Sequence, residues 1–246
     1  ANQHCARLLD VGEAEGGLAY LAMELVDGRT LDVVMRSGPL PPAHAVTILR
    51  QVAEALGAIH ANGLVHCDLS PRNVMVAARD GELHVKVLDF GIARSSSLAS
   101  GDRSGGALAG FANPAFAAPE LLAGGAVEAR ADLYSLGTLG WFLLSGTMPV
   151  DDAEPKRAAS AVAAGALRPW PGTKGVPRRL VRLLLRCLQH APDARPASAA
   201  AVAAELAAIA RANRPVLART AIAAAALAIV AAIATHRGQQ PFLRVW

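Results

Sequence analysis

The stretch His66-Cys67-Asp68-Leu69-Ser70-Pro71-Arg72-Asn73 decides the fold of this chain, together with Asp89-Phe90-Gly91 further along. Asp68 and Asn73 lie on one tight loop, and Asp89 ends an apolar strand that follows, so two carboxylates and an amide can converge on one point. Such a set of oxygen atoms suits Mg²⁺, which takes a few protein oxygens together with phosphate oxygens and water. A carboxylate that does not hold the metal can accept a proton from an attacking hydroxyl.

The sequence around these motifs predicts an α+β fold. Apolar runs from Arg7 to Val26 predict a β-hairpin, and strands are expected from Val74 to Ala77 and from Leu83 to Leu88, joined by Arg79-Asp80-Gly81. A helix should begin at Pro41-Pro42 and end at Asn62-Gly63. The later part of the chain is expected to be helical over Asp132 to Ser145, Ala158 to Ala166, Pro177 to Gln189 and Ser198 to Ala210.

Three further motifs follow in order. They are Ala118-Pro119-Glu120, Asp132 in Asp132-Leu133-Tyr134-Ser135-Leu136-Gly137, and Arg195 in Asp193-Ala194-Arg195-Pro196. With the first two motifs, this set resembles the protein kinase superfamily, and in particular the bacterial eukaryotic-like (Hanks-type) Ser/Thr protein kinases. One such motif alone would be weak, but five in this order are a specific signal.

The resemblance implies roles for individual residues. Asp68 would be the catalytic base, and Asn73 and Asp89 would hold Mg²⁺ next to ATP. Ser70 stands where many Ser/Thr kinases have a lysine near the γ-phosphate, and we assign it to the catalytic group. By the same resemblance Asp132 holds the backbone of the catalytic loop, and Arg195 pairs with the glutamate of the Ala-Pro-Glu motif.

A nucleotide site is implied by Met23-Glu24-Leu25-Val26-Asp27-Gly28, which resembles the hinge between the two kinase lobes. Backbone groups at Glu24 and Val26 would bind adenine, with Met23 as the gatekeeper. Met75 would pack beneath the purine. Composition alone favours ordinary core packing for both methionines.

The chain departs from the family pattern at its start. No Gly-rich phosphate loop, strand lysine or partner glutamate precedes the hairpin, and none of Lys86, Lys156 and Lys174 stands where it could replace that lysine. We therefore expect the chain as written to be inactive and N-terminally truncated, with the missing motifs encoded upstream. The alternatives are a pseudokinase that scaffolds partners and a small-molecule phosphotransferase of kinase-like fold.

The stretch from Arg94 to Gly110 is rich in Ser and Gly, and we expect a mobile functional loop there. Cys67 replaces the arginine that binds a phosphate on this loop in many family members. Asn113 likewise stands where many have a threonine. We therefore expect that the serines of the loop need no phosphorylation, and these are Ser95, Ser96, Ser97, Ser100 and Ser104.

Residues 220–235 contain no charged side chain, and Arg211, Arg214 and Arg219 precede them. A helix over this segment, lengthened by a few flanking residues, approaches the thickness of a bilayer. We expect a single transmembrane helix with the kinase domain in the cytoplasm, because basic residues flank membrane segments on that side. The alternative is a soluble Ala-rich helix packed on the domain, in a cytoplasmic protein.

These expectations divide the chain into a partial kinase N-lobe (1–26), a mostly helical C-lobe (27–211), a basic linker (212–219), the hydrophobic helix (220–235) and a short tail (236–246). The implied cofactors are ATP and Mg²⁺, and the implied partners are proteins with Ser or Thr hydroxyls and the membrane. Nucleic acid is disfavoured despite the net charge of +4, because only 4% of residues are aromatic. The three cysteines lack metal-ligand spacing, which argues against a zinc site.

Overall fold

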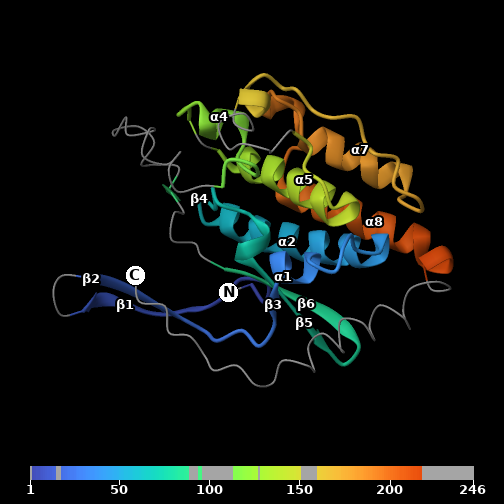
Figure 1. The fold of residues 1–246 in the computed structure, drawn as a ribbon. Coiled ribbons are helices and arrows are strands. Elements are labelled where there is room, and N and C mark those ends of the chain that lie inside the picture. The colour runs from blue at the N-terminus through green and yellow to red at the C-terminus, as the bar shows by residue number, and fades with distance from the viewer. Residues whose placement is uncertain are drawn as a thin grey trace.

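The computed structural model describes residues 2–14, 18–88, 94–95, 113–126, 128–150 and 160–217. Short strands lie along one side and helices form the opposite side (Figure 1). The strands are β1 (Leu8–Ala14), β2 (Leu18–Met23), β3 (Arg29–Thr30), β4 (Leu64–Val65), β5 (Val74–Arg79), β6 (Glu82–Val87) and β7 (Arg94–Ser95). The helices are α1 (Leu31–Met35), α2 (Pro42–Ala61), α4 (Pro119–Leu122), α5 (Ala129–Ser145), α7 (Arg178–Cys187) and α8 (Ala199–Leu217), with 3₁₀ turns at Pro71–Asn73 and Pro192–Ala194. The α+β expectation is confirmed.

Helix α2 forms the centre of the helical part, packed against α5, α8 and β6. Its apolar residues recur every three to four positions, so Leu49, Val52 and Leu56 are all buried on one face. Helix α5 approaches closely at Gly140, where an added Cβ would lie 3.0 Å from a Leu49 methyl and 2.5 Å from one of Leu184. This contact joins three helices in one core.

Strands β3, β5 and β6 form a small antiparallel sheet under the helices. The β5–β6 turn has left-handed backbone at Asp80 (φ 52°) and Gly81 (φ 78°), which matches the twist of a tight hairpin. Met75 of β5 pairs with Lys86 of β6. Strand β6 therefore leads along the sheet toward Leu88 and the Asp89 motif, which lies outside the described residues.

Strands β1 and β2 form a separate antiparallel hairpin, as expected, although the second strand ends at Met23 rather than Val26. Its apolar side chains are unusually open to solvent, with Leu9 56% and Val11 63% exposed. A two-stranded hairpin is only marginally stable alone. The hairpin is attached to the rest of the protein through residues 2–7, which precede it and contact α2 and β6.

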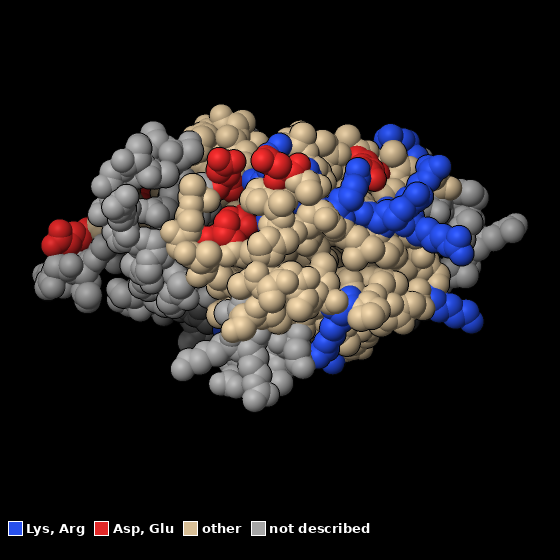
Figure 2. Space-filling view, turned by 90° about the horizontal axis from the view of Figure 1, so that it is seen from above, with Lys and Arg blue, Asp and Glu red and all other residues tan. Residues whose placement is uncertain are grey.

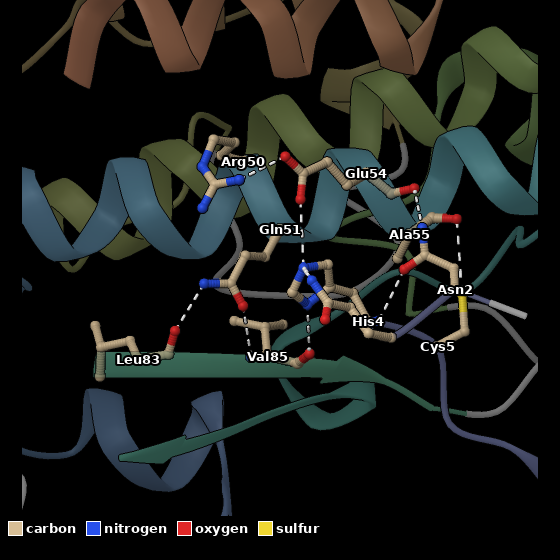
Figure 3. A network of polar contacts seen from close by, with 10 residues as sticks. Asn2, His4, Cys5, Arg50, Gln51, Glu54, Ala55, Leu83 and Val85 are labelled. Atoms are coloured by element: carbon tan, nitrogen blue, oxygen red, sulfur yellow. Dashed lines mark hydrogen bonds and ion pairs between the residues drawn. The ribbon is translucent and has the colours of Figure 1, made fainter. Parts of the chain in front are cut away.

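That attachment is a polar network around His4 (Figure 3). The His4 ring lies between α2 and β6, with Nδ1 3.1 Å from the Val85 carbonyl oxygen and Nε2 3.3 Å from Glu54 Oε2. Asn2 Nδ2 donates to the Glu54 carbonyl, and the Gln51 side chain accepts from Val85 N. The N-terminal segment is thus fixed before the chain enters β1.

The helix predictions hold for α2, α5 and α7 within a few residues at each end. Helix α8 continues to Leu217, beyond the expected end at Ala210 and into the predicted linker. Of the predicted helix Ala158 to Ala166, residues 160–163 are helical and 164–165 form a turn, because Gly165 adopts left-handed backbone (φ 65°). The short helix α1 follows the hinge region and was not predicted.

Within the described part of the chain, no helix is long and apolar enough to cross a bilayer. The predicted transmembrane segment 220–235 lies outside that part, as does most of the loop Arg94 to Gly110.

A buried ion pair connects α4 to the turn before α8. Arg195 binds Glu120 through both guanidinium nitrogens, at 2.6 and 2.8 Å, and also donates to the carbonyl oxygens of Gln189, Arg130 and His190. Its side chain is fully buried. Every nitrogen of the guanidinium therefore has a partner, as burial of a charge requires.

We predict that Glu120→Gln lowers the free energy of unfolding by about 3 kcal/mol, because it leaves the buried Arg195 charge without its counter-ion. The matched control is Glu205→Gln. Glu205 pairs with Arg186 at the surface, where both side chains are about half exposed, and its loss should cost less than about 1 kcal/mol. Urea denaturation measures both, and equal effects would contradict a structural role for the buried pair.

Candidate active site

The carboxylate of Asp132, near the start of α5, is fully buried beneath the catalytic-motif loop. Its Oδ2 accepts hydrogen bonds from His66 N at 2.9 Å and His60 Nε2 at 2.7 Å. Its Oδ1 accepts from Cys67 N at 2.9 Å. One side chain therefore fixes two consecutive peptide groups of the loop, in agreement with the role that the resemblance implied for Asp132.

The loop needs this support because Cys67 has left-handed backbone, with φ of 66°. This conformation is unfavourable for a residue with a side chain. The Cys67 side chain is buried, and its Sγ lies 3.7 Å from the Val65 carbonyl oxygen. The strained residue therefore lies directly before Asp68 in the chain.

His66 connects this loop to the strand that precedes Asp89. The Asp68 backbone N–H donates to His66 Nδ1 at 3.3 Å, so the ring proton belongs on Nε2, which lies 3.0 Å from the Leu88 carbonyl oxygen. His66 is completely buried. The structure therefore places it as a packed residue that positions its neighbours.

Asp68 and Asn73 contact each other directly. Asn73 Nδ2 donates to both the Asp68 carbonyl oxygen and Asp68 Oδ2, each at 2.8 Å. The 3₁₀ turn Pro71–Asn73 brings them together, since Asn73 N bonds back to the Ser70 carbonyl. Leu88 N in turn donates to the Asn73 carbonyl at 2.8 Å. The Asp68 loop and the residue before Asp89 are thus tied at Asn73 and at His66.

These positions suit a cation on one side of the loop. Both bonds of the Asn73 amide use its nitrogen, which leaves Oδ1 as the atom that can ligate a metal. Asp89 lies outside the described residues. Among the described residues, no cluster of three His, Cys, Asp or Glu side chains could hold a metal ion. A magnesium site here would accordingly need Asp89 and phosphate oxygens in addition to Asn73.

The remaining predicted loop residues have different surroundings. Ser70 is only 3% exposed, so most of its side chain is covered. Asn113 meets Asp68 through its backbone, with Asn113 N donating to Asp68 Oδ1 at 3.3 Å. Its own side chain caps the following turn by accepting from Ala115 N. In this structure Asn113 thus contacts the loop without using its side chain.

Met23 is the last residue of β2, and the hinge residues Glu24 and Val26 come directly after it. Glu24 N donates to the Arg7 carbonyl, which continues the hairpin by one rung. Within the described residues, the Glu24 carbonyl and the Val26 N–H make no backbone hydrogen bond, so both remain available to a ligand. Met23 and Met75 are each partly buried.

The Glu24 side chain has a partner that sequence reasoning did not find. Lys86 Nζ lies 2.5 Å from Glu24 Oε1 and 3.2 Å from the Cys5 carbonyl oxygen. The bond from Lys86, together with that from Arg7 N, holds the pKa of the Glu24 carboxyl below its usual range. Lys86 therefore connects β6, the hinge and the N-terminal segment. Its position opposite Met75 on the paired strand was predictable, but the approach of the hinge was not.

The fold and this site are those of a protein kinase. The family model described as protein kinase domain matches residues 3–206, and the chain belongs to this family. It is 38% identical over 209 residues to the serine/threonine-protein kinase pkn2 of Myxococcus xanthus, an alignment that covers 82% of this chain and 25% of the relative.

Two further relatives give the same result. The serine/threonine-protein kinase PknB of Mycobacterium leprae is 37% identical, with 80% of this chain and 32% of the relative covered. The serine/threonine-protein kinase pkn3 of Myxococcus xanthus is 37% identical, and the alignment covers 84% of this chain and 39% of the relative. The chain thus spans between a quarter and two fifths of the length of these relatives.

We predict that Asp132→Asn destabilises the catalytic loop. Both oxygens of Asp132 accept hydrogen bonds, and in the variant the amide nitrogen, itself a donor, would replace one of them and face an N–H group. The free energy of unfolding should fall by about 2 to 3 kcal/mol. Hydrogen exchange at the His66 and Cys67 amides should become faster than at other buried amides. Asp27→Asn, at an exposed position, is the control and should change neither quantity. Unchanged exchange at both amides would contradict the role given to Asp132.

Proposed function

We propose that this chain is part of a serine/threonine protein kinase, which transfers the γ-phosphoryl group of ATP to Ser or Thr hydroxyls of proteins. The observation that carries the proposal is the contact between Asp68 and Asn73, on a loop whose backbone is fixed by the buried Asp132. Membership of the kinase family and the names of the relatives support the reaction class.

In the proposed mechanism, Asp68 accepts the proton of the substrate hydroxyl as that oxygen attacks the γ-phosphorus of ATP. The bond between the γ-phosphorus and the β-phosphate oxygen breaks, and ADP leaves. Asn73 Nδ2 and Asn113 N each donate to one Asp68 oxygen, and this fixes the plane of the carboxylate before substrate binds. Such positioning provides most of the catalysis in phosphoryl transfer. Ser70 is a buried residue of the loop itself, and its carbonyl accepts from Asn73 N in the turn between Asp68 and Asn73.

ATP would be held at the hinge and at the Asn73 side of the loop. The Glu24 carbonyl and the Val26 N–H present an acceptor and a donor to the adenine edge, with Met23 and Met75 packing around the ring. Asn73 Oδ1 and Asp89 would hold Mg²⁺, which when bound neutralises charge on the phosphate oxygens.

We also propose that residues 220–235 tether the kinase to a membrane, with the domain on the cytoplasmic side. Support comes from sixteen residues without a charged side chain, preceded by Arg211, Arg214 and Arg219. Flanking residues would have to lengthen the segment to span the hydrocarbon core.

The roles of Asp68 and Asp89 can be separated in the full-length protein. Asp68→Asn and Asp89→Ala should each lower phosphoryl transfer by about 100-fold or more. Asp89→Ala should also weaken Mg·ATP binding, measured by titration calorimetry, while Asp68→Asn should leave it nearly unchanged because only Asp89 is a proposed metal ligand. Equal nucleotide affinity in the two variants would refute the assignment.

Activation without loop phosphorylation is a second expectation, because Cys67 cannot bind a phosphate as arginine does. Replacing Ser95, Ser96, Ser97, Ser100 and Ser104 together by Ala should change kcat/KM by less than about tenfold. The measurement is initial-rate kinetics against the phosphatase-treated parent. A similar loss of activity in both would show that the segment depends on phosphate, with Arg94 or Arg103 as its partner.

A further inference from the structure

Helix α7 has an unusually basic surface. Its sequence, Arg178-Arg179-Leu180-Val181-Arg182-Leu183-Leu184-Leu185-Arg186-Cys187, buries Leu180, Leu183, Leu184 and Cys187 in the core and leaves all four arginines exposed. Seen from above, Lys and Arg side chains gather over the region of α7, and most acidic side chains of this face lie apart from them (Figure 2). The helix therefore presents one strongly positive stripe to solvent.

A groove between α7 and α8 runs along this stripe. It has a volume of about 430 Å³ and is lined by Arg179, Arg182, Arg186, Glu205, Ala208 and Ile209. Glu205 pairs with Arg186, whereas Arg178, Arg179 and Arg182 have no ion pair among the described residues. These three guanidinium groups have no acidic partner among the described residues and lie beside a partly apolar groove floor. Such a surface favours an anionic partner.

The arginines lie in a row along α7 and do not surround a single point. Positions 179, 182 and 186 span two turns of α7, or about 10 Å at 1.5 Å per residue. A single phosphate is smaller than that distance, whereas neighbouring headgroups in a lipid surface can meet successive arginines. The geometry thus favours an extended anionic surface over one phosphorylated side chain.

The course of α8 gives the second observation. Glu205 meets Arg186 while Ala208 and Ile209 line the groove with Arg179 and Arg182, so the two helices run in opposite directions. From Ile209 the helix continues to Leu217, about 12 Å further at 1.5 Å per residue. Arg211 is exposed on this last stretch, and the uncharged segment 220–235 follows in the sequence. The basic groove therefore lies about 12 Å along α8 from Leu217, which precedes the proposed tether by three residues in the sequence.

We propose that the basic face of α7, formed by Arg178, Arg179, Arg182 and Arg186 with the groove toward α8, binds the acidic lipid headgroups of the membrane that residues 220–235 enter. The proposal rests on the tether given above. Docking would hold α7 against the bilayer and leave the opposite side of the molecule, with β5 and β6, turned away (Figure 1). Attraction to an anionic surface acts within a Debye length, about 8 Å at physiological salt, so arginines this near the surface would contribute directly.

The test is flotation of the full chain with vesicles of phosphatidylcholine alone or with added phosphatidylglycerol. Acidic lipid should raise the partition coefficient of the parent, and added salt should reduce the gain. Arg179→Gln/Arg182→Gln should lower binding to acidic vesicles about thirtyfold, from two arginines at about 1 kcal/mol each. The matched control is Arg36→Gln/Arg79→Gln, which removes two exposed arginines remote from α7 and should retain most of the gain. Thermal unfolding checks that both variants are folded.

The outcomes separate the proposals. Flotation with neutral vesicles without any gain from acidic lipid would overturn the docking face and leave the tether intact. Arginine-dependent binding to acidic vesicles alone would support the face and refute the tether. An equal loss of binding to acidic vesicles in both variants would show that only the net charge of the protein matters, and it would overturn the proposal. Release from acidic vesicles by a soluble phosphoserine peptide, but not by its unphosphorylated form, would overturn the lipid assignment. Kinase activity of the corresponding full-length variants, assayed without vesicles, tests the reaction independently.

Discussion

The buried carboxylate of Asp132 is the interaction on which the site depends. It lies at the start of α5, where the helix is packed on α2, and it accepts from His60 of α2 and from two peptide groups of the loop. A buried carboxylate needs several donors to offset its lost hydration. The loop needs an anchor because Cys67 is held in left-handed backbone. The loop amides of His66 and Cys67 supply the donors that the carboxylate needs, and the carboxylate in turn holds the loop. Asp68 is positioned as a result.

The second anchor, between Arg195 and Glu120, joins α4, which carries the Ala118-Pro119-Glu120 motif, to the turn before α8. The guanidinium also lies over the ring of Tyr134, 5.1 Å from its centroid, within the range of a cation–π contact. Burial raises the pKa of the Tyr134 hydroxyl to about 12, so the ring stays neutral beside this ion pair at physiological pH. Asp132 and Tyr134 are neighbours on α5, and this helix therefore supports both the catalytic loop and the Glu120 motif.

Polar contacts of a different kind hold the hinge. His4, Glu54 and Gln51 attach the N-terminal segment to α2 and β6, and Lys86 connects that segment to Glu24. His4 and Gln51 are buried, whereas the charged side chains of Glu54, Lys86 and Glu24 are partly exposed. The ion pairs of these three side chains are therefore individually modest. Together they fix the start and the end of the β1–β2 hairpin, whose own apolar side chains remain exposed. The hinge is thereby placed against the helical part without an extensive hydrophobic interface.

Local signals in the sequence determined much of this protein. Pro42 and Asn62 define the ends of α2, and Asp80-Gly81 defines the β5–β6 turn. The order of the motifs identified the family. These features depend on backbone preferences and on chemistry between residues close in the chain, which spacing can show.

Contacts between distant segments required the tertiary structure. The sequence placed Lys86 on a strand but could not show that the hinge passes within 2.5 Å of it, and it gave no sign that His60 would share Asp132 with the loop. The left-handed backbone at Cys67 was equally hidden, because the residue type does not favour it and the hydrogen bond from Cys67 N to Asp132 comes from a distant helix. The antiparallel packing of α7 on α8, which forms the basic groove, was likewise decided by the helix packing. Such features arise from the three-dimensional arrangement of the chain, which brings together ion-pair and hydrogen-bond partners that lie tens of residues apart in the sequence.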